Sequence, residues 1–251
     1  MKPAFLNTKP RYPKSWQDIP LGTEIKVEIE QQLAEISRQF FGYHLVNIGN
    51  LSSEIALSQC PIKHLVNITP QINEHSSLCS LSRELPLSEN SVDAILIANE
   101  LDFAQDPHQI LREVDRVIIP NGHVVIVGFN PYSLAGVLKY LPIKQQNILH
   151  DARFFSAPRI KDWLGLLSFE VIEQKQIIFS ELFFNRKFNS QSRGYLWAEK
   201  YIPLLSSMYI VVAKKRVIPL SPIKPKWKAK TNFSPVGASM RTHSANREPI
   251  E

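Results

Sequence analysis

Residues 85–131 alternate between apolar blocks and amphipathic blocks in an order that predicts a strand, a helix and a second strand. Residues 92–98 and 124–129 are almost unbroken apolar runs, which are typical of parallel strands that are buried on both faces. The segment between them, residues 106–117, has apolar residues at helical spacing, namely Ile110, Leu111, Val114 and Val117. This strand, helix and strand order predicts an α/β fold.

The boundaries of that central helix have clear sequence signals. Asp106 can cap the helix, Pro107 suits its first position, and Gln109 has the spacing of a capping box. The sequence Pro-Asn-Gly at residues 120–122 is expected to turn the chain into the next strand.

The flanking sequence predicts further elements of the same kind. A helix is expected over residues 24–41, where apolar residues recur at helical spacing and Gly42 can end it. We expect strands at residues 44–48, 64–68, 77–81, 169–179 and 208–213, a short helix that includes residues 55–57, and a capped helix that starts at Ser156. These elements divide the chain into an N-terminal segment (residues 1–23), an α/β domain (24–216) and a tail (217–251).

Composition places the chain among ordinary intracellular proteins. Its 251 residues, 44% of them hydrophobic, are enough for one core without disulfides or metals. Cys60 and Cys79 are far apart and form no CxxC pair, and the seven histidines show no metal-ligand spacing. The sequence has no 18-residue apolar run and no apolar core near its start, so we expect a cytoplasmic protein without a transmembrane segment.

The net charge of +6 is concentrated at the C-terminal end of the sequence. From Lys214 onward there are nine lysines and arginines against two glutamates, which leaves the preceding part at about −1. The tail is rich in proline and polar residues and is expected to be extended and disordered. Residues 214–230 combine cations with Trp227 and could bind nucleic acid or an anionic membrane surface, although a purely solubilising tail is about twice as common an outcome.

Three motifs resemble the type 11 superfamily of class I S-adenosylmethionine-dependent methyltransferases. LPLSENSVD and LREVDRVIIPNG are similar to the family's LPFPDNSFD and LREVxRVLxPGG, and WLGLLSFEVIE is similar to xWLxxxGFEVxE, with Ser168 at the glycine. The resemblance covers roughly residues 16–216. It implies a Rossmann-like, doubly wound, mostly parallel seven-stranded sheet with an antiparallel edge hairpin, S-adenosylmethionine as cofactor, and an unidentified methyl acceptor.

The same resemblance assigns candidate cofactor residues to the ends of the first three strands. LVNIGNLSSE stands where the family has VLDIGCGTGE, so Asn47 replaces an acid, Gly49 is kept, and Asn50 follows it. An ordinary strand-to-helix turn is an equally common role for such a lone glycine. Thr69 ends the second strand in place of an acid that binds ribose. Leu81 and Ser82 lie near the position that binds adenine, where Leu81 could equally be a core residue.

Further polar residues follow the fourth and fifth strands. Asn99 and Glu100 come directly after a buried strand, so Asn99 is a candidate cofactor residue and Glu100 a general base or a ligand for a substrate amine. A solvated carboxylate at a helix edge is the alternative for Glu100. Asn130 and Tyr132 are candidate substrate contacts, or belong to a turn stiffened by Pro131.

Three classes of function therefore remain. The first is an S-adenosylmethionine-dependent methyltransferase. The second is a degenerate methyltransferase fold that acts as a binding or regulatory protein, with its basic tail as one contact. A nicotinamide-dependent oxidoreductase is much less favoured, because it would need a GxGxxG turn and an acid after the second strand.

Overall fold

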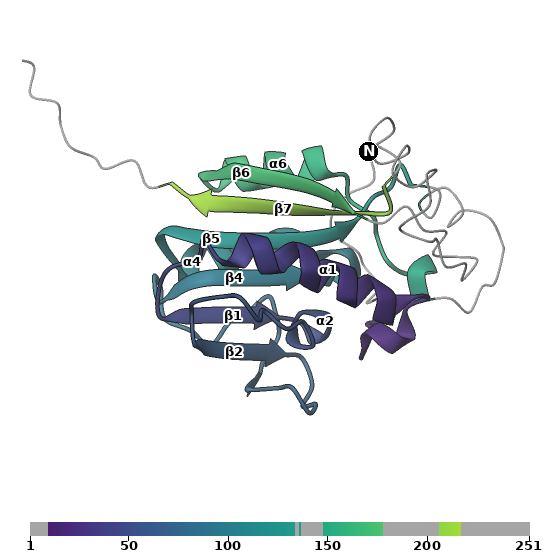
Figure 1. Cartoon of the computed structure of the whole chain (residues 1–251), viewed down its shortest axis with the longest axis horizontal. Coiled ribbons are helices and arrows are strands. Elements are labelled where there is room, and N and C mark those ends of the chain that lie inside the picture. Colours follow the sequence, from purple (N-terminus) through teal and green to yellow (C-terminus); the bar gives the residue numbers. More distant parts are fainter. Residues whose placement is uncertain (1–9, 134–135, 137–147, 178–205, 217–251) are drawn as a thin grey trace, which may run out of the picture. The chain divides into compact units, whose positions relative to one another are not determined.

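The computed structural model describes residues 10–133, 136, 148–177 and 206–216, and these contain one seven-stranded sheet (Figure 1). The strand order is β3-β2-β1-β4-β5-β7-β6. β7 runs antiparallel to both of its neighbours, and the other pairs are parallel. The strands are β1 (His44–Ile48), β2 (His64–Thr69), β3 (Leu78–Cys79), β4 (Val92–Ala98), β5 (Ile118–Phe129), β6 (Phe169–Ile177) and β7 (Met208–Lys215). The order and the antiparallel edge hairpin confirm the predicted fold class.

Helices lie on both faces of this sheet. Figure 1 shows α1 in front of the central strands and α4 behind them. The described helices are η1 (Trp16–Asp18), α1 (Gly22–Ser37), α2 (Asn50–Ser53), α3 (Glu100–Phe103), α4 (Pro107–Val117), η2 (Ile148–His150) and α6 (Ala157–Leu166). No helix among the described residues is both long enough and apolar enough to span a membrane.

The strand sequences explain the two helical layers. Successive side chains of a strand point to opposite faces, so an unbroken apolar strand needs a cover on each side. In β4, Ala94, Leu96 and Ala98 belong to the core cluster that contains α1, while Ile95 and Ile97 belong to the cluster that contains α4 and α6. The continuous apolar run therefore has a structural cause, as predicted.

The predicted cap of α4 is confirmed. The Asp106 carboxylate accepts hydrogen bonds from the backbone N–H groups of His108 and Gln109, at 3.0 and 3.1 Å. The capping box is not formed, because the Gln109 side chain accepts a hydrogen bond from Arg112 at 2.7 Å and not from the N–H group of Asp106.

The predicted helix end at Gly42 was wrong. α1 ends at Ser37, and Gly42 lies in the loop beyond it with φ +144°. A Cβ at Gly42 would come within 2.2 Å of the Asp93 side chain, whose Oδ2 accepts the N–H groups of Tyr43 and His44. The chain thus leaves the helix early, and Asp93 fixes the start of β1.

Two other local predictions were also wrong. The helix after β1 covers residues 50–53, and Ile55 is a buried core residue outside any helix. Residues 120–122 lie inside β5, because pairing with β4 has already begun at Ile118 and then skips to His123. The Pro-Asn-Gly sequence is therefore part of an irregularity in the strand pairing. Residues 178–179 and the tail, 217–251, lie outside the described residues, so the predictions for them stay predictions.

Candidate functional site

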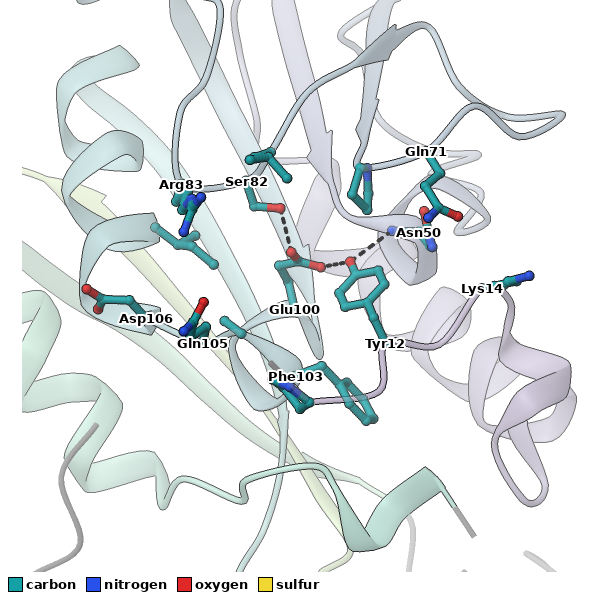
Figure 2. Close-up of a pocket in the computed structure, with 15 residues that line it drawn as sticks. Tyr12, Lys14, Asn50, Gln71, Ser82, Arg83, Glu100, Phe103, Gln105 and Asp106 are labelled. Carbon is teal, nitrogen blue, oxygen red and sulfur yellow. Dashed lines mark hydrogen bonds between the residues drawn. The ribbon is translucent and has the colours of Figure 1, made fainter. Parts of the chain in front are cut away.

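The carboxyl ends of β1, β2 and β4 and the loop after β3 enclose a cavity of about 390 Å³ (Figure 2). Parallel sheets of this type bind ligands at this edge, where the strand order reverses, and the volume is within the usual range of ligand pockets. The wall includes Asn50, Gln71, Ser82 and Glu100 from the strand ends, Phe103 from α3, and Tyr12 from the N-terminal segment.

Glu100 is the buried carboxyl group of this cavity. It is 5% exposed, at the start of α3. Its Oε2 accepts a hydrogen bond from the Tyr12 hydroxyl and its Oε1 accepts one from the Ser82 hydroxyl (Figure 2). Burial raises the pKa of Glu100 to about 8, and no charged neighbour among the described residues offsets this effect. The alternative of a solvated helix-edge carboxylate is thereby excluded.

The turn after β1 lies directly against this carboxyl group. Gly49 has φ 96° and ψ 162°, a conformation that is essentially limited to glycine. A Cβ at Gly49 would lie 2.2 Å from Glu100 Oε2 and 2.7 Å from the Tyr12 hydroxyl oxygen. Glycine is therefore required here by the backbone conformation and by the close approach of Glu100.

The N-terminal segment is attached to the same turn by three hydrogen bonds. The Asn50 N–H donates to the Tyr12 hydroxyl oxygen at 3.3 Å, and the Asn50 side chain donates to the Pro13 carbonyl at 3.0 Å. The Trp16 indole N–H donates to the Leu51 carbonyl at 2.9 Å, and Trp16 is 1% exposed. These bonds therefore hold the N-terminal segment in place as one wall of the cavity.

Some of the candidate cofactor residues line the cavity and others lie outside its lining. Asn50, Leu81 and Ser82 line it, and Gly49 contacts the Glu100 and Tyr12 groups that do. Leu81 is 40% exposed, which argues against a simple core role.

Asn47, Thr69 and Asn99 are fully buried and do not belong to the lining. The Asn47 side chain donates to Asn67 at 3.0 Å, the Thr69 hydroxyl donates to the Gln71 carbonyl at 2.8 Å, and the Asn99 side chain donates to Asp102 at 3.0 Å. These bonds connect β1 to β2 and stabilise the loops around the cavity, so a direct role of these residues in cofactor binding stays a prediction.

The two candidate substrate residues after β5 also lie apart from this cavity lining. The Asn130 side chain donates to the Ser206 carbonyl at 2.9 Å and accepts from the Tyr132 N–H at 3.1 Å. Tyr132 is 55% exposed. The local bonds are those of a turn, and substrate contact stays a prediction.

Sequence reasoning missed the contribution of the N-terminal segment. Tyr12 and Lys14 line the cavity, and the Tyr12 ring makes an edge-to-face contact with Phe103 at 6.4 Å between ring centroids. The available signal was the aromatic pair Tyr12 and Trp16 in the N-terminal segment. Neither residue matches a family motif, so a pattern search could not assign them.

The arrangement supports two kinds of chemistry. A carboxyl group with a pKa near 8 can gain or lose a proton at neutral pH, and it can also form an ion pair with a cationic ligand. The described residues contain no group of three or more His, Cys, Asp or Glu side chains that could hold a metal ion.

Comparison with known proteins agrees with this fold. Residues 43–126 match the family described as "Methyltransferase domain". The chain is 37% identical over 221 residues to the uncharacterized protein YafS of Escherichia coli. This match covers 88% of each protein.

Solved structures show the same fold at low sequence identity. A chain of the Haloferax volcanii complex between the Trm112 methyltransferase activator and a methyltransferase gives a TM-score of 0.56 at 14% identity, covering 77% of this chain and 92% of that one. An S-adenosylmethionine-dependent methyltransferase of Mesorhizobium loti gives 0.52 at 13% identity, covering 74% and 96%. Residues 43–126 thus form a type 11 methyltransferase domain, the sheet order and the solved structures show the class I methyltransferase fold, and the match to YafS shows that the chain belongs to the same family as YafS.

Proposed function

We propose that the protein is an S-adenosylmethionine-dependent methyltransferase that acts on a still unidentified acceptor. The observation that carries the proposal is the cavity at the carboxyl ends of β1, β2 and β4, in a chain that belongs to this family. An ordinary contact between a helix and the sheet would not explain the polar side chains that line the cavity at this edge.

The residues of the cavity fit the cofactor in chemistry. S-adenosylmethionine combines an adenine, a ribose, an amino-acid end and a sulfonium, and its net charge is positive. The buried carboxyl group of Glu100, without a cationic partner among the described residues, suits such a ligand. Leu81 would contact the adenine, and Gly49 and Asn50 would lie at the amino-acid end. Asn47, Thr69 and Asn99 support these loops from behind.

Methyl transfer requires little acid or base catalysis from the protein. The bound cofactor supplies a methyl group that is already activated, so the chain has to align the acceptor with it and exclude water. The N-terminal segment, with Tyr12 packed on Phe103, covers one side of the cavity and contributes to that exclusion. Asn130 and Tyr132 are proposed as acceptor contacts, since they follow the next strand at the same edge.

Thermal unfolding tests the proposal directly. S-adenosylmethionine or its demethylated product, at about 100 times its Kd, should add about 2.7 kcal/mol to the free energy of unfolding. In a domain of this size that is a rise of about 5–10 °C in Tm. NAD is the control ligand and should give no rise. A protein that unfolds cooperatively but shows no shift at millimolar ligand would contradict the proposal.

One observation favours a second candidate, a degenerate fold that acts as a binding protein. Leu51 and Ser53 replace the family's further glycines, and both are buried in α2. Tyr12 and Glu100 also fill the space beside Gly49. The basic residues 214–230 would then be a contact for nucleic acid or an anionic surface, and binding of such a partner without any cofactor binding would support this candidate.

A further inference from the structure

We propose that Glu100 binds the α-ammonium group of the cofactor and thereby replaces the contacts that the missing glycines of the turn would have provided. This inference rests on the proposed function, because it names the group that receives the amino-acid end of S-adenosylmethionine. It differs from the family pattern, in which the backbone of a glycine-rich turn approaches that end.

The Glu100 carboxyl group has no counterion among the described residues. The carboxyl group is held by two hydroxyl groups, those of Tyr12 and Ser82, and forms no ion pair with a described residue. An ionised carboxylate without a counterion is costly to bury, so such a group either stays protonated or receives a cation from outside the fold. Because Glu100 also lines the cavity, a ligand in the cavity can supply that cation.

The position of the Glu100 carboxyl group beside Gly49 also supports the proposal. Glu100 Oε2 lies so close to Gly49 that no side chain would fit between them, at the turn where relatives receive the amino-acid end of the cofactor. Leu51 and Ser53, at the positions of the lost glycines, are 2% and 6% exposed and point into the fold. The carboxyl group is thus a polar group that lies beside this turn and faces the cavity, together with the Tyr12 hydroxyl and Asn50.

The other charged side chains that line the cavity also suit a ligand with an amino-acid end. Lys14 and Arg83 line the same cavity and offer positive charge, whereas Asp106, at the start of α4, adds a negative one. Tyr12 is the other titratable group in contact with Glu100. A ligand end that carries both an ammonium and a carboxylate matches this combination, since each of its charges finds the opposite sign in the wall.

The proposal predicts that the protein releases protons when the ligand binds. At pH 7 the Glu100 carboxyl group of the free protein is mostly protonated, because its pKa is about 8. Pairing with an ammonium favours the ionised form, so the proton passes to the buffer when the ligand binds. Close to one proton should therefore be released for each ligand bound at pH 7, and fewer as the pH rises above 8.

The experiment is isothermal titration calorimetry of the full chain with S-adenosylhomocysteine at pH 7, in buffers whose ionisation enthalpies differ. The buffer dependence of the heat gives the number of protons released. The matched ligand is 5′-methylthioadenosine, which keeps the nucleoside and lacks the amino-acid end, and it should bind without releasing a proton. This comparison needs no variant, so it does not depend on how a substitution affects folding.

The variant Glu100→Gln keeps the size of the side chain and removes its charge. It should weaken S-adenosylhomocysteine binding about tenfold or more, abolish proton release, and leave 5′-methylthioadenosine binding unchanged. Glu35→Gln is the control, because Glu35 has a side chain that is 73% exposed on α1, and it should match the wild type.

The outcomes separate this inference from the proposed function. If the wild type binds S-adenosylhomocysteine without proton release and Glu100→Gln binds it equally well, the role of Glu100 is overturned while the cofactor site stands. If the wild type binds neither nucleoside ligand, the proposed function fails and this inference fails with it.

Discussion

Replacing Gly49 by alanine should destabilise the fold and disturb the Glu100 site together. At φ 96° and ψ 162° an alanine is strained by about 1–3 kcal/mol. The new Cβ would also lie 2.2 Å from Glu100 Oε2, so the carboxyl group has to move, at a cost of the same order as overpacking a core, about 1–3 kcal/mol. We expect Gly49→Ala to lower the free energy of unfolding by about 2–6 kcal/mol in urea denaturation.

A second pair of variants separates the two contributions to the Gly49 effect. In a Glu100→Ala background the clash with the carboxyl group is gone, and only the backbone strain and the 2.7 Å approach to the Tyr12 hydroxyl oxygen remain, so Gly49→Ala should cost less than it does in the wild type. Gly165→Ala is the control, because Gly165 is in α6 with no atom within 4 Å of its added Cβ, and it should raise stability by about 0.5–1 kcal/mol. A loss below about 0.5 kcal/mol for Gly49→Ala would refute this reasoning.

Three other predictions follow from single contacts. Ser52→Ala should lower the free energy of unfolding by about 1–3 kcal/mol in urea denaturation, because the Ser52 hydroxyl accepts the buried Ala98 N–H at 2.7 Å, and an unchanged midpoint would contradict it. Asp106→Ala should cost about 1 kcal/mol through loss of the α4 cap, whereas Asp106→Asn should retain most of the stability in the same assay. The free energy of unfolding should fall as pH rises from about 4.5 to about 8, since the raised pKa of Glu100 favours the protonated folded state; this component should be absent from the pH profile of Glu100→Gln.

The sequence could predict the fold because its signals are local or repeated over several elements. The stripe of α4 and its Asp106 cap depend on neighbouring residues, and the apolar run of β4 reflects burial on two faces. The antiparallel edge hairpin came from the resemblance, and the antiparallel pairing of β7 with β5 and β6 bears it out. Helix ends were less predictable, because Asp93, 49 residues beyond His44, determines how the chain enters β1.

The candidate site was predicted in part for the same reason. Asn50, Ser82 and Glu100 could be selected because they follow strands, and strand ends meet at one edge of a parallel sheet. Tyr12 could not be selected, since its position depends on Trp16 reaching the Leu51 carbonyl 35 residues away. The burial of Glu100 depends on Tyr12 in turn, so its raised pKa was also beyond a local pattern.

The anchoring of Trp16 makes Tyr12 a tethered competitor for the site. Tyr12 lies four positions before Trp16, whose side chain is fixed in the core, so the Tyr12 Cα atom can move only about 14 Å from that of Trp16 even when the stretch between them is fully extended. A group on so short a tether has an effective concentration in the millimolar range. A ligand that binds Glu100 in place of the phenol therefore competes against this local concentration, which stays the same however far the protein is diluted.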